Sequence, residues 1–217
     1  MQLELSRNEL VALVGRQIEN LFGFRQEKER EALSVSVDAA LERCEFCFSR
    51  TRNKYYSRDG APYFNPFHSG QYSIFLYFLS NSVFRLYPAA RTLADRVYYL
   101  NKALNGLDLF YEVDMPRVFF LDHPIGSVLG RATYGESFAF AQNCTVGNNK
   151  GVYPVIGQNV RMMAYSMILG ACQIGDNVIL SARSYVKDTD IPSCSVVFGA
   201  HPNLVVKARD ESYFKAS

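Results

Sequence analysis

The chain has 217 residues, of which 48% are hydrophobic and 20% are charged. These proportions are ordinary for a globular protein and exclude a disordered, collagen-like or acidic-tail chain. The formal net charge is only +2, from 23 basic and 21 acidic residues, so the sequence lacks the broad basic footprint that nucleic-acid binding needs. We therefore expect no nucleic-acid partner.

The sequence also indicates where the protein works. It contains an odd number of irregularly spaced cysteines, and its start lacks the basic segment, apolar segment and cleavage site of a secretion signal. The longest apolar stretch, residues 72–84, is too short to span a bilayer and is interrupted by Ser80-Asn81-Ser82. We expect a cytoplasmic protein with no membrane span, in which this stretch is a buried helix.

The first half of the chain has a helical pattern. Ser6 and Glu9 form a Ser-x-x-Glu capping box, and apolar residues then recur at helical spacing. A loop rich in Gly, Pro, Asn and Tyr covers residues 53–69. We predict an all-helical region over residues 1–107, with one helix after Ser6 and others over residues 27–49, 72–85 and 88–105.

A different period begins at Ile156. Large side chains then recur at six-residue steps, interrupted only by Pro192, and mostly small or β-branched side chains recur four positions after each. Such a pattern is typical of a hexapeptide β-helix, in which three short strands make one coil and the coils stack. A plain antiparallel sheet would not keep large and small residues in separate columns. The large column is Ile156, Met162, Ile168, Ile174, Leu180, Val186 and Phe198, and the small column is Val160, Ser166, Cys172, Val178, Ser184, Asp190 and Val196.

The period extends backwards through Val146, Phe140 and Tyr134, with a one-residue slip before Leu129. It is broken over residues 147–154, which we interpret as a loop extruded from the coil. Because repeat folds have open ends, a cap at one end and packing against neighbouring subunits are expected. We therefore predict a β-helix over residues 108–217, capped by the helices of residues 1–107.

His123 is the candidate catalytic residue. Histidine accepts a proton near neutral pH, and a neighbouring carboxylate can fix its tautomer and stabilise its charged form. Asp114 and Asp122 are both candidates for that carboxylate.

An ordered series of motifs runs through the second half of the chain: residues 94–101 (ADRVYYLN), Glu112-Val113-Asp114, Leu121-Asp122-His123, Val128-Leu129-Gly130, residues 142–147 (QNCTVG), residues 153–157 (YPVIG), and the closing residues 191–202. In these motifs, residues 94–209 resemble the serine acetyltransferase branch of the left-handed β-helix (hexapeptide-repeat) acyltransferases. The resemblance implies a left-handed parallel β-helix, a homotrimer or a dimer of trimers, and acetyl transfer from acetyl-CoA to a hydroxyl.

By position, His123 matches the general base of this family. Asp114 matches the aspartate that orients the base, although the interval between them is one hexapeptide shorter here. The base removes the proton of the acceptor hydroxyl as its oxygen attacks the thioester, and returns a proton to the leaving thiolate. Transfer is then direct, without an acyl-enzyme intermediate.

Two departures concern the acceptor. Serine acetyltransferases carry a second histidine ahead of the Pro-Lys-Ile of their loop, where this chain has Tyr153-Pro154-Val155, and the loop over residues 147–151 is shortened. The helical half is short for that family, and the last residues, 213–217, do not end in the isoleucine that the family uses to dock the next enzyme. With these departures, the chain resembles the serine-acetyltransferase-like proteins of bacterial capsule and O-antigen biosynthesis, including those that modify sialic-acid polymers. The candidate acceptor-binding residues are Tyr153, Asn143 and Lys150.

The resemblance also implies a groove for coenzyme A between adjacent β-helices. Small residues at Ala164, Gly170, Ser181 and Ala182 would allow the pantetheine arm to approach the backbone, and Arg183, Lys187 and Lys207 are candidates for its phosphates. We expect no metal, because the lone pair Cys44 and Cys47 has no partner pair and is interpreted as helix packing.

The sequence therefore predicts an acetyl-CoA-dependent O-acetyltransferase that acts on a hydroxyl of a bacterial surface polysaccharide or its sugar precursor. One alternative is a serine O-acetyltransferase of cysteine biosynthesis. Another is a binding or scaffold β-helix without catalysis. Transfer to the amine of an amino sugar also remains open, since the same base serves both acceptors.

Overall fold

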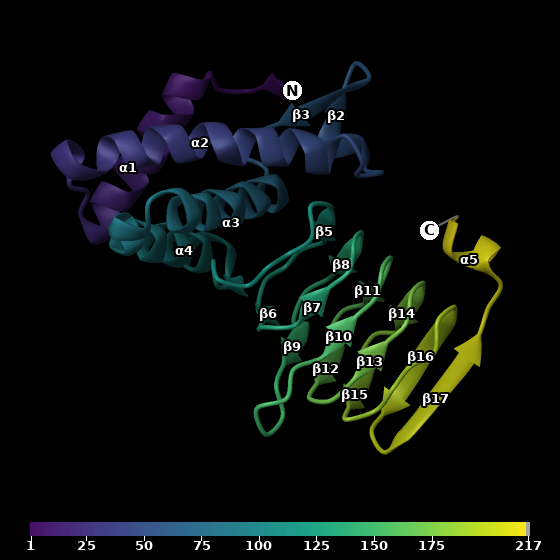
Figure 1. Ribbon diagram of the computed structural model, residues 1–217. Coiled ribbons are helices and arrows are strands. Elements are labelled where there is room, and N and C mark those ends of the chain that lie inside the picture. Colours follow the sequence, from purple (N-terminus) through teal and green to yellow (C-terminus); the bar gives the residue numbers. More distant parts are fainter. Residues whose placement is uncertain (216–217) are drawn as a thin grey trace. The chain divides into compact units, whose positions relative to one another are not determined.

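A computed structural model describes residues 1–215 and divides the chain into two compact units (Figure 1). The first unit runs from Met1 to Glu112 and the second from Val113 to the C-terminus. The two final residues of the C-terminal motif, 216 and 217, lie outside the described residues.

The first unit contains the four predicted helices. They are α1 (Arg7–Phe22), α2 (Gln26–Phe48), α3 (Ser69–Leu86) and α4 (Arg91–Asn105), the last preceded by a short 3-10 turn, η2 (Pro88–Ala90). The capping box is present, because the Ser6 side chain accepts from the Glu9 backbone and the Glu9 side chain accepts from the Ser6 backbone. Helix α4 is capped at its C-terminus by Gly106, whose left-handed φ of 63° favours glycine.

Helix α3 is the core of this unit. Every residue from Gly70 to Val83 is buried, and α3 packs against α2 and α4 (Figure 1). This confirms the buried-helix interpretation of the long apolar stretch. Among residues 1–215, no helix is both long and apolar enough to cross a membrane.

The expectation of an all-helical first half is wrong, because a small sheet lies beside the helices. It consists of β1 (Gln2–Leu3), β2 (Ser57–Arg58) and β3 (Ala61–Phe64), with the 3-10 turn η1 (Lys54–Tyr56) before β2. Strand β1 pairs in parallel with β3, so that Gln2 lies opposite Tyr63. Strands this short show no readable alternation, and their pairing depends on residues far apart in sequence. A further short strand, β4 (Asp108–Leu109), follows α4.

The second unit is a stack of short parallel strands that form the three faces of a β-helix (Figure 1). Its strands fall into three paired series, which confirms the predicted fold class. One face contains β5 (Phe119–Leu121), β8 (Phe138–Phe140), β11 (Arg161–Met162), β14 (Val178–Leu180) and β16 (Ser195–Ala200). The second contains β6 (Val128–Leu129), β9 (Thr145–Gly147), β12 (Met167–Leu169) and β15 (Tyr185–Lys187), and the third contains β7 (Thr133–Tyr134), β10 (Val155–Ile156) and β13 (Gln173–Ile174).

The six-residue column predicts the interior of this stack up to Val186. From Tyr134 to Val186, each large residue of the series is buried. Close stacking also requires glycine at some corners: a Cβ on Gly135 would overlap the backbone of Gly157 in the next coil. Layers of buried aliphatic side chains therefore hold the coils together.

The prediction is wrong at the end of the series. Phe198 is 38% exposed and Asp190 is exposed, whereas Ile191 and Val197 are buried. Val197 lies opposite Leu180 in the pairing register, so it takes the inward place expected for Phe198. The corner after Val186 is one residue shorter than the others, and this shifts every later residue by one position.

The C-terminal segment closes the stack. Strand β17 (Asn203–Ala208) pairs antiparallel with β16, and the short helix α5 (Glu211–Lys215) follows.

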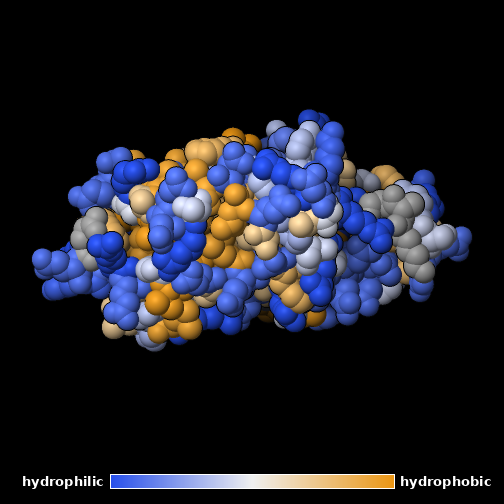
Figure 2. Space-filling view, turned by 90° about the horizontal axis from the view of Figure 1, so that it is seen from above, coloured by the Kyte–Doolittle hydropathy of each residue, from blue (hydrophilic) through white to orange (hydrophobic). Residues whose placement is uncertain are grey.

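The molecular surface in Figure 2 is mostly hydrophilic with separate apolar patches. Exposed apolar side chains of the second unit include Ile125, Val128, Met163, Tyr165 and Met167.

Candidate functional site

His123 lies in an enlarged corner of the β-helix. Six residues separate Leu121 from Val128, whereas four separate their paired residues Phe140 and Thr145 in the next coil. The backbone N–H of Ile125 donates to the His123 carbonyl at 2.8 Å, which closes a tight turn inside the enlarged corner. His123 itself has a φ of 50°. The corner therefore projects His123 from the regular path of the coil.

The imidazole is open to solvent and has an acidic neighbour. The side chain of His123 is 85% exposed, and its Nε2 lies 3.5 Å from Oδ1 of Asp122. This is the ion pair that His123 makes within the described chain when its ring is protonated. Asp114 is also exposed and lies between β4 and β5. An exposed histidine paired with a carboxylate has the chemistry of a general base.

Asn143 lies against the His123 corner. Its backbone N–H donates to the carbonyl of Ile125 at 3.0 Å, and a Cβ on Gly126 would overlap the Asn143 side-chain oxygen. Gly126 has a φ of 72°, so both its backbone and its surroundings require glycine. The structure thus brings two predicted site residues, His123 and Asn143, into adjacent corners.

The enlarged corner is the first of a stack of corners. The N–H of Tyr165 donates to the carbonyl of Gln142, and the N–H of Arg183 donates to the carbonyl of Ala164 at 3.0 Å. Adjacent coils are about 4.8 Å apart, so the Arg183 corner lies about 14 Å along the stack from the His123 corner. Four predicted cofactor residues lie in this stack: Ala164, Ser181, Ala182 and Arg183.

The sequence interpretation missed Tyr165. Its side chain is 50% exposed, and the Arg183 guanidinium lies 6.0 Å from its ring centroid. Tyr165, Asn143 and Arg183 all have positive φ values at the same place in successive corners. Aligning the corners in the sequence, rather than only the inward residues, would have placed Tyr165 in this group.

The predicted extruded loop is a short hairpin. Asn149 and Val152 exchange two backbone hydrogen bonds of 3.0 Å, and the turn residues Lys150 and Gly151 both have positive φ values. Lys150 is exposed and Tyr153, which follows the hairpin, is 43% exposed. The interruption of the six-residue period is therefore confirmed as an excursion from the coil.

The remaining predicted cofactor residues lie elsewhere. Gly170 and Lys187 belong to the corner stack that carries the hairpin, where the N–H of Gly170 donates to the carbonyl of Gly147 at 3.0 Å. Lys207 lies on β17 and its ammonium is 5.5 Å from the ring centroid of Phe198. The structure therefore does not gather the three candidate phosphate cations in one corner stack.

The cysteines are structural. Cys44, Cys47 and Cys172 are fully buried free thiols, and burial raises the pKa values of Cys44 and Cys172. This confirms the interpretation of the Cys44 and Cys47 pair as helix packing. In the described part of the chain, no three His, Cys, Asp or Glu side chains gather in a way that could hold a metal ion.

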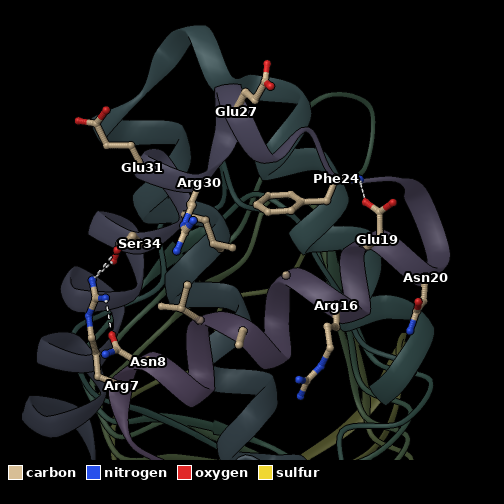
Figure 3. Close-up of a pocket in the computed structure, with 14 residues that line it drawn as sticks. Arg7, Asn8, Arg16, Glu19, Asn20, Phe24, Glu27, Arg30, Glu31 and Ser34 are labelled. Atoms are coloured by element: carbon tan, nitrogen blue, oxygen red, sulfur yellow. Dashed lines mark hydrogen bonds between the residues drawn. The ribbon is translucent and has the colours of Figure 1, made fainter.

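A cavity of about 1040 Å³ lies between α1 and α2 in the helical unit (Figure 3). Its wall combines arginines with glutamates over an apolar floor. It contains none of the predicted site residues, so the His123 corner remains the candidate site. The charged wall residues are Arg7, Arg16, Arg30, Glu19, Glu27 and Glu31, and the floor includes Val11, Ala12, Gly15 and Leu33.

Comparison with known proteins identifies relatives of this chain. Residues 153–188 match the family model described as bacterial transferase hexapeptide (six repeats). A serine acetyltransferase of Staphylococcus epidermidis is 30% identical over 147 residues, which cover 64% of this chain and 66% of that protein. A serine acetyltransferase of Helicobacter pylori is 30% identical over 130 residues, which cover 58% of this chain and 73% of that protein.

Solved structures share the fold at lower identity. A serine acetyltransferase of Vibrio cholerae has a TM-score of 0.72 at 20% identity, covering 94% of this chain and 80% of that one. A serine acetyltransferase of Brucella abortus in complex with coenzyme A has a TM-score of 0.68 at 20% identity, covering 95% of this chain and 83% of that one. The repeat match agrees with the β-helix, and the Helicobacter pylori relative is 30% identical with 73% of its length covered, so the chain belongs to the serine acetyltransferase family of hexapeptide-repeat transferases.

Proposed function

We propose that this protein is an acetyl-CoA-dependent O-acetyltransferase with His123 as its general base. The observation that carries the proposal is the position of His123, exposed beside Asp122 in an enlarged corner at the start of the Ala164 to Arg183 stack. His123 would take the proton of the acceptor hydroxyl while that oxygen attacks the thioester carbonyl. The proton then passes to the leaving thiolate, so the histidine ends neutral and no acyl-enzyme forms.

Two carboxylates are proposed to assist the base. Asp122 is within 3.5 Å of the His123 ring and would stabilise the imidazolium that forms during the reaction. Asp114 is proposed as the orienting aspartate by its position in the family motif. Variants Asp122→Asn and Asp114→Asn should both lower kcat, and a larger loss for one would identify the carboxylate that carries the role.

Coenzyme A is proposed to lie along the corner stack. Backbone groups at Ala164, Ser181 and Ala182 would meet the pantetheine arm, and Arg183 would meet a phosphate about 14 Å from the base. The Brucella abortus serine acetyltransferase of similar fold is bound to coenzyme A in its solved structure, which supports this cosubstrate. We further propose a cytoplasmic homotrimer, or a dimer of trimers, to be tested by analytical ultracentrifugation; the five free cysteines favour a reducing compartment.

The acceptor has two candidates. The sequence relatives are serine acetyltransferases, so the comparisons favour L-serine over the surface-saccharide acceptor that the sequence departures suggest. The segment that follows the hairpin gives a specific reason to keep a sugar hydroxyl as the second candidate acceptor. Tyr153 stands at the place of the family's second histidine and offers an exposed ring and hydroxyl, which suit a sugar ring.

A single assay distinguishes these acceptors. Thiol release from acetyl-CoA is followed with L-serine, nucleotide sugars, sialic acids and capsule oligosaccharides, for the wild type and for His123→Ala. Turnover with serine alone supports a serine O-acetyltransferase, and turnover with a saccharide supports the surface-polysaccharide function. Acetyl-CoA binding without turnover of any acceptor, and without an effect of the substitution, would support a binding or scaffold protein.

A further inference from the structure

A carboxylate of the coil, that of Asp188, forms a hydrogen bond with the hairpin at residues 149–152. Asp188 lies in the corner after β15, two coils beyond the hairpin's base. Its Oδ2 accepts from Nδ2 of Asn149 at 2.5 Å, and its Oδ1 accepts from the backbone N–H of Ala171 at 2.9 Å. The same side chain therefore joins the hairpin, the Ala171 corner and its own corner.

Gly170 makes this arrangement possible. Its φ is 80°, and a Cβ at this position would overlap Oδ1 of Asp188 and lie 2.6 Å from the Asn149 Cβ. Asp188 and Asn149 therefore contact each other above Gly170, where only glycine leaves room for both side chains. The N–H of Gly170 also donates to the carbonyl of Gly147 at the base of the hairpin.

A second aspartate shows which of these contacts is unusual. Asp176 also accepts from the backbone of the preceding coil, at 2.7 Å from the N–H of Gln158, and it also lies over a glycine, Gly157. This is an ordinary corner cap, and it involves no hairpin residue. Asp188 makes the same cap and in addition holds the side chain of Asn149.

We propose that Asp188 is a positioning residue for the acceptor, which fixes the hairpin and thereby holds Lys150 and Tyr153 at the coil surface. The inference rests on the proposed function, in which Tyr153 contacts the acceptor, and takes Lys150 at the hairpin tip as the second candidate acceptor-binding residue. Asp188 itself does not touch the reacting atoms. It acts through Asn149, because the hairpin's own two hydrogen bonds fix its shape but not its attachment to the coil.

The attachment can be tested without measuring catalysis. The Lys150–Gly151 bond at the hairpin tip is a trypsin site, and its cleavage rate in the native protein reports how often the hairpin leaves the coil. Asp188→Ala and Asn149→Ala should each speed cleavage at this bond by about fivefold to tenfold, since each removes a hydrogen bond to a charged group. Asp176→Ala is the matched control, because it removes a corner cap of the same kind and should leave this rate unchanged.

The positioning role needs a kinetic measurement on the same variants. With whichever of L-serine or the saccharides the wild type acetylates, Asp188→Ala should raise the acceptor KM about tenfold, with the KM for acetyl-CoA within about twofold of wild type. Asp188→Asn should restore much of both properties, because the Asn149 amide can turn to accept from the new amide. Asp176→Ala should leave the acceptor KM unchanged.

Each outcome decides part of the proposal. Equal cleavage in Asp188→Ala and Asp176→Ala would show that Asp188 does not hold the hairpin. Faster cleavage with an unchanged acceptor KM would show that the hairpin is held but does not position the acceptor. A wild-type protein that acetylates no acceptor would overturn the proposed function and the positioning role together, while the trypsin result would still decide whether Asp188 attaches the hairpin.

Discussion

Replacement of Ile168 by alanine tests the packing that holds the β-helix together. Ile168 is fully buried and lies between Val146 and Val186 in successive coils. The substitution removes three buried carbon atoms, worth about 2.4 kcal/mol at about 0.8 kcal/mol per CH₂ group. The cavity left behind adds to this loss, so we expect the free energy of unfolding of the second unit to fall by about 3 kcal/mol.

Met167→Ala is the matched control in the same strand. Met167 points outward and is 37% exposed, so its loss should change the free energy by less than about 1 kcal/mol. Native-state hydrogen exchange, read by mass spectrometry on peptides of the second unit, separates this unit from the helices. The most protected amides should exchange about 100-fold faster in Ile168→Ala. A change no larger than that of Met167→Ala would contradict the inward column of large side chains.

Three further predictions follow from the site. Arg183→Ala should raise the KM for acetyl-CoA about tenfold by loss of a phosphate contact, whereas Arg131→Ala, in the corner between β6 and β7, should not; equal KM values would remove Arg183 from the cofactor site. Gly126→Ala should lower kcat at least about tenfold, because a side chain there displaces the histidine corner; wild-type kcat would show that this corner is not catalytic. The N–H of Ala171 donates to Asp188 and lowers the pKa of its carboxyl group. The contribution of the ionised carboxylate to the free energy of unfolding is therefore retained above the ordinary pKa of 3.8, and it is lost only as the pH falls through the lower folded-state value. The NMR shift of the Ala171 amide should therefore titrate with a midpoint below 3.8, and a higher midpoint would contradict the hydrogen bond.

The sequence predicts the β-helix well because each coil repeats the same physical requirement. One inward position per face must be large and apolar, and this requirement is visible at Ile156 and at each later step to Val186. The prediction fails at Phe198 because one shortened corner shifts the register by one residue. The interruption of the series at Pro192 marks this place, and the inward residue there is Ile191, one position earlier. The sheet formed by β1 and β3 was not predictable, because strands of two and four residues show no clear period and their pairing joins the two ends of a long segment.

The site was only partly visible in the sequence. The motif indicates His123 as the candidate base, and the structure places Asp122, one of the two candidate carboxylates, 3.5 Å from its ring. Tyr165 was missed because its position matters only when corners are compared across coils. The contact between Asn149 and Asp188 joins residues far apart in sequence, and no spacing rule relates a hairpin to a later corner.

The central claim is that His123 is the base of an acetyl transfer from acetyl-CoA. The most direct test is thiol release with the acceptor that the wild type turns over, measured for His123→Ala alongside wild type. We predict that kcat falls by about 10²-fold or more, with the hydrogen-exchange protection of the second unit unchanged. Wild-type rates in a folded His123→Ala protein would contradict the account.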